Sequence, residues 1–173
     1  NGRETFTDAN GYSYEVVIDQ NTGTRTETSS DGVVRTERTD GSFEVVYPDG
    51  SKDTGIMNAD GNLIMAFADG SAHIIREDGS ETYTDPYGVT TVITTDAEGR
   101  ETAVSSDGWT STTSADGSTT VTTNPNGEVE TTVYSEDGTV TITSSDGSTN
   151  RYDPSSGLTT YLDANGSVYS VSY

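Results

Sequence analysis

Short runs of β-forming residues alternate with Asp-Gly or Asn-Gly pairs along most of the chain. The clearest stretch runs from 39 to 79, where Asp-Gly pairs at 40–41, 49–50, 60–61, 69–70 and 78–79 bracket apolar segments of mostly seven residues. Asp followed by Gly is typical of tight two-residue hairpins of the primed type, which require positive φ at both central residues. The pattern therefore predicts antiparallel hairpins with one short strand between successive turns.

Two-residue turns fix the cross-strand partners that we expect. Directly opposed apolar and aromatic pairs stabilise a sheet, and seven-residue strands between such turns keep each side chain on its own face. One predicted ladder consists of Phe43, Ile56, Met65, Ile74 and Tyr83, beside a pair in which Phe67 faces Ala72. The opposite face is predicted to carry Met57, Ile64 and Ile75.

Glycine recurs throughout the chain at spacings of 9 to 12 residues, with the single exception of Gly55. Such periodicity marks a repeat architecture, here one strand and one turn per unit, and no helical period appears. We therefore expect an all-β fold in one repetitive domain over residues 1–173. The favoured form is a long antiparallel meander of about 17 hairpin-linked strands, as an open single-layer or wrapped sheet. The alternative is a β-solenoid with parallel strands.

The composition leaves an alternative to this fold. Only 29% of residues are hydrophobic and the formal net charge is −21, values that are typical of disordered chains. Disorder, however, does not require glycine at fixed spacing, and it depletes the β-forming residues that are abundant here, including ten Tyr. We therefore predict the folded sheet.

Charge and composition also limit the partners. Eight Lys and Arg stand against 29 Asp and Glu, which argues against binding to nucleic acid or anionic membranes. There is no Cys, and no stretch approaches the roughly 20 apolar residues of a membrane span, so membrane insertion is not expected. The sequence begins at Asn1 without a Met or signal peptide, which suggests processing or a longer parent chain. Low Lys, dense Thr and Ser, and acidity favour an extracellular or cell-surface location.

One family resemblance rests on Tyr-Asp units. The segment YDPSSG (152–157) matches the Tyr-Asp-x-x-Gly pattern of YD (RHS) repeats, and the stretch 83–108 resembles it with an inserted residue. In that family the repeats wrap into a large hollow shell in secreted toxins and cell-surface adhesins. The resemblance implies a shell fragment of such a protein.

A second resemblance lies in the stretch 40–80. The segments YPDGS (47–51), FADGS (67–71) and REDGS (76–80) resemble the G-box of the T-complex-ten family of centriole-assembly proteins. That family has a free-standing antiparallel sheet, solvated on both faces, that self-associates end to end and binds a proline-rich peptide. The resemblance therefore implies a peptide- or protein-binding β-sheet scaffold.

Candidate chemistry is sparse. His73 is the sole histidine, and without Cys or a second His we expect it to be a packed or surface residue next to Ile64 and Ile75 rather than a catalytic group. Asn58, Asp60 and Asn62 alternate oxygen ligands like a calcium loop but lack the downstream Glu, which makes them a weak calcium candidate. No cofactor and no other metal site is predicted.

Two surface features complete the candidates. Asn165 begins the sole N-glycosylation sequon, Asn165-Gly166-Ser167, on a predicted hairpin tip. Threonine arrays between 96 and 150 resemble the hydroxyl lattice of ice-binding proteins, although Thr is also the default polar residue of an exposed strand.

The function predicted from these observations is structural. A single layer would leave its apolar ladders exposed, and neither terminal strand is blunted by Pro or Lys, so edge pairing and face packing between copies are expected. We therefore predict a non-enzymatic subunit of an extracellular or surface filament, with itself and glycans as its partners. Its self-association or partner-binding residues are predicted to be Phe43, Ile56, Met57, Ile64, Met65, Phe67, Ile74, Ile75, Tyr83, Tyr169, Val171 and Tyr173. The alternatives are the peptide-binding scaffold and the toxin or adhesin shell fragment.

Overall fold

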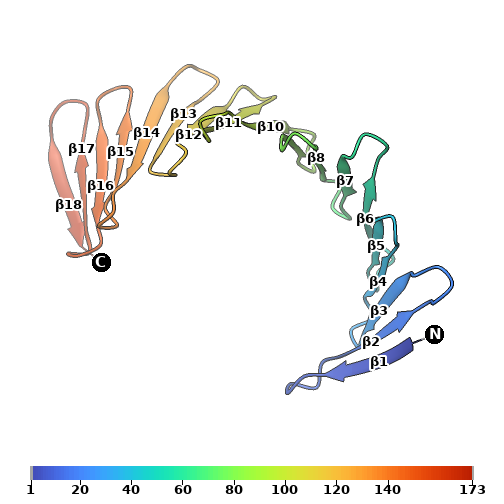
Figure 1. Cartoon of the computed structure of the whole chain (residues 1–173). Coiled ribbons are helices and arrows are strands. Elements are labelled where there is room, and N and C mark those ends of the chain that lie inside the picture. Colours follow the sequence, from blue (N-terminus) through green and yellow to red (C-terminus); the bar gives the residue numbers. More distant parts are fainter. Residues whose placement is uncertain (1, 173) are drawn as a thin grey trace. The chain divides into compact units, whose positions relative to one another are not determined.

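The computed structural model describes residues 2–172, which form 18 β-strands and no helix. The chain divides into two units, Asn1–Gly88 and Val89–Tyr173. In each unit the strands follow one another in chain order (Figure 1). Because residues 2–172 contain no helix, they contain none that is long and apolar enough to cross a membrane.

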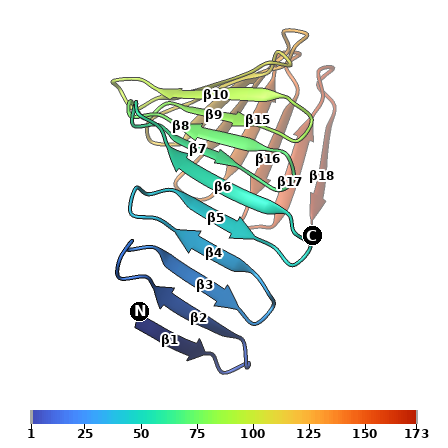
Figure 2. The same ribbon diagram turned by 90° about the vertical axis from the view of Figure 1, so that its right-hand side faces the viewer.

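The first unit holds nine strands. Its strands are β1 (Gly2–Thr7), β2 (Ser13–Ile18), β3 (Arg25–Ser29), β4 (Val34–Glu37), β5 (Phe43–Val46), β6 (Lys52–Met57), β7 (Leu63–Ala66), β8 (Ala72–Ile75) and β9 (Glu81–Thr84). Each pairs antiparallel with the next, as the side-by-side arrows of β1 to β5 show in Figure 2.

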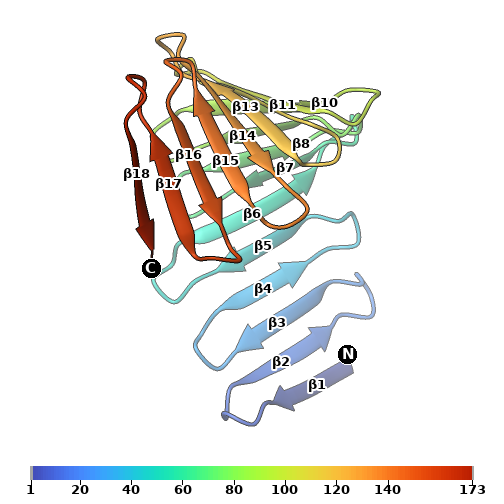
Figure 3. The ribbon, with the colours of Figure 1, turned by 90° about the vertical axis from the view of Figure 1, so that its left-hand side faces the viewer.

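The second unit holds the other nine. Its strands are β10 (Thr90–Thr95), β11 (Glu101–Ser105), β12 (Thr110–Thr113), β13 (Thr119–Thr123), β14 (Val129–Tyr134), β15 (Val140–Ser144), β16 (Thr149–Asp153), β17 (Leu158–Leu162) and β18 (Val168–Ser172). They also pair antiparallel in succession, and Figure 3 shows β14 to β18 face on. The predicted all-β open meander is confirmed, and the parallel solenoid is wrong.

Most turns are three-residue loops. In the loop Pro48-Asp49-Gly50, the Gly50 N–H donates to the Tyr47 carbonyl and the Tyr47 N–H donates to the Ser51 carbonyl, both at 2.9 Å. This is a type I turn followed by a left-handed glycine. The predicted two-residue primed turns are wrong because they need Asp49 at positive φ, whereas only glycines among the described residues have it.

The extra loop residue shifts the predicted partners by one position. Phe43 faces Gly55 rather than Ile56, and Met65 faces His73 rather than Ile74. Each predicted ladder therefore contained residues from both faces of the sheet. The row that contains Phe43 is Phe43, Gly55, Met65, His73 and Tyr83, which we call the Gly55 row.

The second predicted ladder fails for the same reason. Met57 and Ile75 both face Leu63, on the face of the Gly55 row. The opposite face carries a separate row of Ile56, Ile64, Ile74 and Thr82.

The sheet has almost no conventional core. In the described residues Val16, at 8% exposure, is the one buried hydrophobic residue, and no side chain is fully buried. Large apolar groups such as Ile56 (51%) and Met57 (50%) are half exposed. Stabilisation therefore comes from backbone ladders and cross-strand pairs, each pair worth about 0.2–1 kcal/mol.

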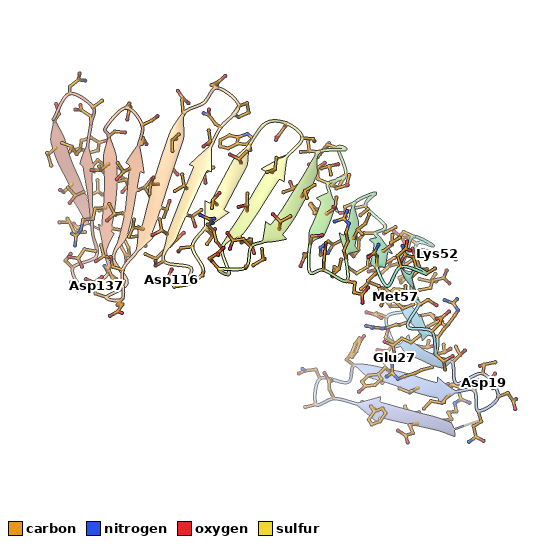
Figure 4. All side chains as sticks on the ribbon, turned by 45° about the horizontal axis from the view of Figure 1, so that its top comes forward. Asp19, Glu27, Lys52, Met57, Asp116 and Asp137 are labelled. Carbon is orange, nitrogen blue, oxygen red and sulfur yellow. The ribbon has the colours of Figure 1, made fainter. Side chains whose placement is uncertain are left out.

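The aspartates of the turns hold the loops with their carboxylates. Asp116 accepts hydrogen bonds from the Ser114 hydroxyl (2.6 Å), the Ser118 N–H (3.0 Å) and the Ser118 hydroxyl (2.7 Å). These bonds favour the charged form and lower the pKa of Asp116 from 3.8 to about 2. Asp137 in the β14–β15 loop accepts the Thr139 N–H at 2.9 Å, and both aspartates are labelled at hairpin tips in Figure 4.

Replacing Gly70 by Ala should destabilise the chain by about 1–2 kcal/mol, the cost of a left-handed conformation for a residue with a Cβ. Gly70 has φ +88°, and a Cβ there would meet nothing within 4 Å, so the effect isolates backbone strain. Urea unfolding measures it. Gly2→Ala is the matched control, since Gly2 lies in β1 without positive φ or a close neighbour. Equal stability of Gly70→Ala and the parent would contradict the turn assignment.

Acid should remove the contribution of Asp116 to stability. Its folded pKa is lowered, so that contribution is present above the unfolded value near 4 and is lost as pH falls through about 2. Asp116→Asn should therefore be less stable than the parent at pH 6, and the gap should close between about pH 4 and pH 2. Urea midpoints across this range test it, with Glu136→Gln as a charge-matched control. A gap that is independent of pH would be inconsistent with this account.

Candidate functional site

The face of the Gly55 row in the first unit carries a shallow hollow. A hollow of about 450 Å³ is lined by Tyr47, Asp53, Phe67, Ala68, Asp69, Ser71 and Tyr83. Strands β5 to β9 and their loops supply these residues. We call this the aromatic hollow.

Asp53 organises the hollow. Its carboxylate accepts the Tyr47 hydroxyl at 2.6 Å through Oδ2 and the Ala68 N–H at 2.7 Å through Oδ1. One side chain of β6 thus fixes both the tyrosine that follows β5 and the loop after β7. The hydrogen bond to Asp53 raises the pKa of the Tyr47 hydroxyl, which keeps the ring neutral and in place.

The Gly55 row lies beside the aromatic hollow on the same face of the sheet. Phe43 lies across Gly55, since a Cβ added there would come within 2.1 Å of the Phe43 ring. Arg35 lies over the same ring, with its guanidinium carbon 5.7 Å from the ring centroid. Glycine in a strand often marks such a close approach, so Gly55 allows an aromatic ring to lie flat on the sheet.

His73 and Tyr83 form the end of the Gly55 row on β8 and β9. His73 Nε2 lies 2.7 Å from Glu81 Oε2, and the His73 and Tyr83 rings meet edge to face at 6.4 Å. Tyr83 is 39% exposed and also lines the aromatic hollow. His73 was expected beside Ile64, but that residue lies on the opposite face.

The structure separates the predicted binding residues into three groups. Those on the face of the Gly55 row are Phe43, Met57, Met65, Phe67, Ile75 and Tyr83. Ile56, Ile64 and Ile74 lie on the opposite face of the same strands. Tyr169 and Val171 lie on β18 in the second unit, where Tyr169 stacks on Tyr161, and Tyr173 is outside the described residues.

Sequence reasoning missed Tyr47, Asp53 and the packing role of Gly55. The signal for Gly55 was present, because it is the one glycine off the repeat spacing. Asp53 had no such signal, since acidic residues are abundant and its two bonds depend on the three-dimensional register.

The remaining candidates lie on turns. The Asn58 side-chain oxygen accepts the Asp60 and Asn62 N–H groups at 3.0 and 2.9 Å, so it holds its own loop. The calcium site at these residues stays a prediction. Asn165 is exposed in the loop between β17 and β18, where its N–H donates to Asp163, and its glycosylation also stays a prediction.

No family model matches the sequence, and no curated protein matches it either. Solved structures do. One is the wild-type TCP10 domain of Danio rerio CPAP in complex with a peptide of Danio rerio STIL, with 24% identity, 99% of this chain and 100% of that chain covered, and a TM-score of 0.40.

Two further solved structures of such domains are also similar to this chain. The TCP domain of SAS-4 (dCPAP) of Drosophila melanogaster, in complex with a proline-rich motif of Ana2 (dSTIL), has 18% identity, coverage of 87% and 90%, and a TM-score of 0.38. The G-box domain of the microcephaly protein CPAP has 20% identity, 99% coverage of both chains and a TM-score of 0.35. The G-box resemblance thus recurs among solved structures, and the YD-repeat resemblance stays a prediction.

These findings correct two predictions. The expected partner was another copy in a filament, but the similar domains of CPAP and SAS-4 are in complex with peptides of different proteins, STIL and Ana2. The expected location was extracellular, but the analysis of the CPAP G-box domain suggests a role in centriole elongation. The composition misled because a sheet with two solvated faces needs the same Thr, Ser and acidic residues as a secreted protein.

Replacing Gly55 by Ala should displace the Phe43 ring and cost about 1–3 kcal/mol, as overpacking does. Urea unfolding of Gly55→Ala, Phe43→Ala and the double variant forms a cycle. Because the two residues occupy one space, the double variant should lose less than the sum of the single losses. Additive losses would refute the packing of Phe43 on Gly55.

Proposed function

We propose that the chain is a non-catalytic scaffold whose first unit binds an extended, proline-rich segment of another protein in the aromatic hollow. The observation that carries the proposal is the hollow of about 450 Å³ with Tyr47, Phe67 and Tyr83 in its lining. Proline-rich segments in the polyproline II conformation dock into shallow aromatic-lined grooves, and their stiffness lowers the entropic cost of binding.

The polar groups of the hollow suit such a ligand. Its two carboxylates already have partners within the protein, since Asp53 is bonded to Tyr47 and Ala68, and Asp69 accepts the Ser71 N–H and hydroxyl. A proline residue has no N–H to donate, so recognition would rest on ring contacts with a few polar bonds at the rim. The similar TCP domain of SAS-4 is in complex with a ligand of this class, a proline-rich motif.

The exposed aromatic and apolar side chains on this face favour the binding of a partner protein, because the chain itself leaves them partly uncovered. Tyr83 is 39% exposed and Met57 is 50% exposed on the face of the hollow. Contiguous exposed apolar surface marks an interaction site. A peptide partner would cover this face without a second copy of the chain.

Alanine at Met65 or Phe67 should weaken binding of a proline-rich peptide about tenfold, because each removes an apolar side chain from the face that the peptide covers. A panel of proline-rich decapeptides, with glycine- and serine-rich decapeptides as ligand controls, can be titrated by calorimetry. Ile64→Ala is the matched protein control, since Ile64 lies beside Met65 on β7 but on the opposite face. Equal losses for Ile64→Ala and Phe67→Ala would reject the aromatic hollow, which Phe67 lines, as the site.

A further inference from the structure

Three adjacent hollows lie along one face of the second unit. Their volumes are about 320, 270 and 300 Å³. The first and third share Trp109 and Thr122, and the first and second share Glu130 and Ser144. They therefore follow one another across β10 to β18, and we call this row of hollows the acidic groove.

The strand register places most of the lining on a single face. Ser111 faces Thr122, Thr122 faces Glu130, and Glu130 faces Ser144, one residue from each of β12 to β15. The neighbouring row on the same face continues to the far end of the groove. It consists of Thr113, Thr120, Thr132, Ile142, Asn150, Tyr161 and Tyr169.

The groove is negatively charged. Its lining carries the carboxylates of Asp107, Glu128, Glu130, Asp146 and Asp163, and the residues described there include no Lys or Arg. Residues 89–173 contain twelve Asp and Glu but only two basic residues, Arg100 and Arg151. Arg100 pairs with Asp96 at 2.8 Å, and Arg151 faces Thr141 on the opposite face of the sheet.

Glu130 is the carboxylate that is free to bind. Asp146 holds the Ser148 N–H at 2.9 Å, Asp163 holds its own turn, and Glu128 accepts the Asn124 amide at 2.5 Å. Within the described residues no hydrogen bond or ion pair occupies the Glu130 side chain, which is exposed where two hollows join. An external cation would give it a partner.

Aromatic rings line the groove on either side of Glu130. Trp109, 46% exposed, lies where the first and third hollows meet, and Tyr161 and Tyr169 of the second hollow stack at 4.9 Å between ring centroids. Aromatic faces attract Lys and Arg side chains. From Trp109 beside β12 to Tyr169 on β18, six strand spacings give about 29 Å, the length of about eight extended residues.

We propose that the acidic groove binds an extended segment of a partner protein that is rich in Lys and Arg. Charge complementarity selects this occupant, since a face with several carboxylates and no cation repels an acidic or phosphorylated ligand. Glu130 takes a cationic side chain, and Trp109 and Tyr169 take others on either side of it. This surface and its ligand are separate from the proline-rich site in the first unit.

Trp109 is the one tryptophan of the chain, so its fluorescence reports on this groove directly. The full chain is titrated with a nonapeptide of alternating Lys and Ser, and with a Glu and Ser nonapeptide as control. The basic peptide should shift the Trp109 emission saturably, and its affinity should fall at least tenfold between 50 and 500 mM salt. The acidic peptide should give no shift.

Two variants localise the site. Glu130→Gln should weaken the basic peptide about fivefold, whereas Glu136→Gln, which removes the same charge from the β14–β15 loop, should change it less than 1.5-fold. Tyr169→Ala should also weaken it several-fold, with Tyr87→Ala, 93% exposed on a loop of the first unit, as control. Circular dichroism verifies that each variant is folded.

Three results would overturn the proposal. Equal losses for Glu130→Gln and Glu136→Gln would show unspecific attraction to a chain of charge −21. Binding of a labelled basic peptide without a Trp109 response would place the ligand elsewhere. A Trp109 shift that depends on protein concentration without peptide would assign the groove to a second copy of the chain.

Discussion

A glycine in the left-handed conformation after a type I turn is the feature on which the rest of each sheet depends. It closes a three-residue loop, and in such a loop the paired residues on either side always have the same parity. Odd-numbered residues therefore stay on one face from β3 to β9, whatever the strand length. The sheet needs no core to keep its faces in register.

This parity rule changes only where a loop has four residues instead of three. Four-residue loops follow β2, β12 and β16, and at each the parity of a face switches from odd to even or back. The loops also pack on one another along an edge of the sheet. Pro154 would lie 3.1 Å from a Cβ at Gly138, so the first residue of one loop covers the glycine of an earlier loop. Glycine is thus required there for both conformation and space.

The sequence allowed the strands, their order and their antiparallel pairing to be predicted, because glycine spacing and β-forming residues are local signals. The register could not be predicted from Asp-Gly alone, since this pair suits both two-residue and three-residue loops. The residue after glycine was the missing signal. Ser71 donates its N–H to Asp69 at 2.9 Å, a bond that favours the three-residue loop.

The candidate site shows the same division between local and distant information. Met65, Phe67 and Tyr83 were predicted because large apolar groups on short strands must be exposed or covered. Asp53 was not predicted, since its role depends on Tyr47 six residues before it and on the Ala68 N–H fifteen residues after it. A one-residue error in register removes that convergence, so only the structure reveals it.

The two surfaces differ in whether their carboxylates already have hydrogen-bond partners within the protein, and this difference determines which kind of ligand each surface suits. In the aromatic hollow, Asp53 has both oxygens bonded to the protein, so the rings remain as the principal contacts. In the acidic groove, Glu130 has no partner within the described residues, so charge dominates. Ring contacts are insensitive to salt, whereas exposed charge pairs weaken as ionic strength rises. One kind of sheet can therefore offer two independent binding modes, because without a core every strand leaves both faces available.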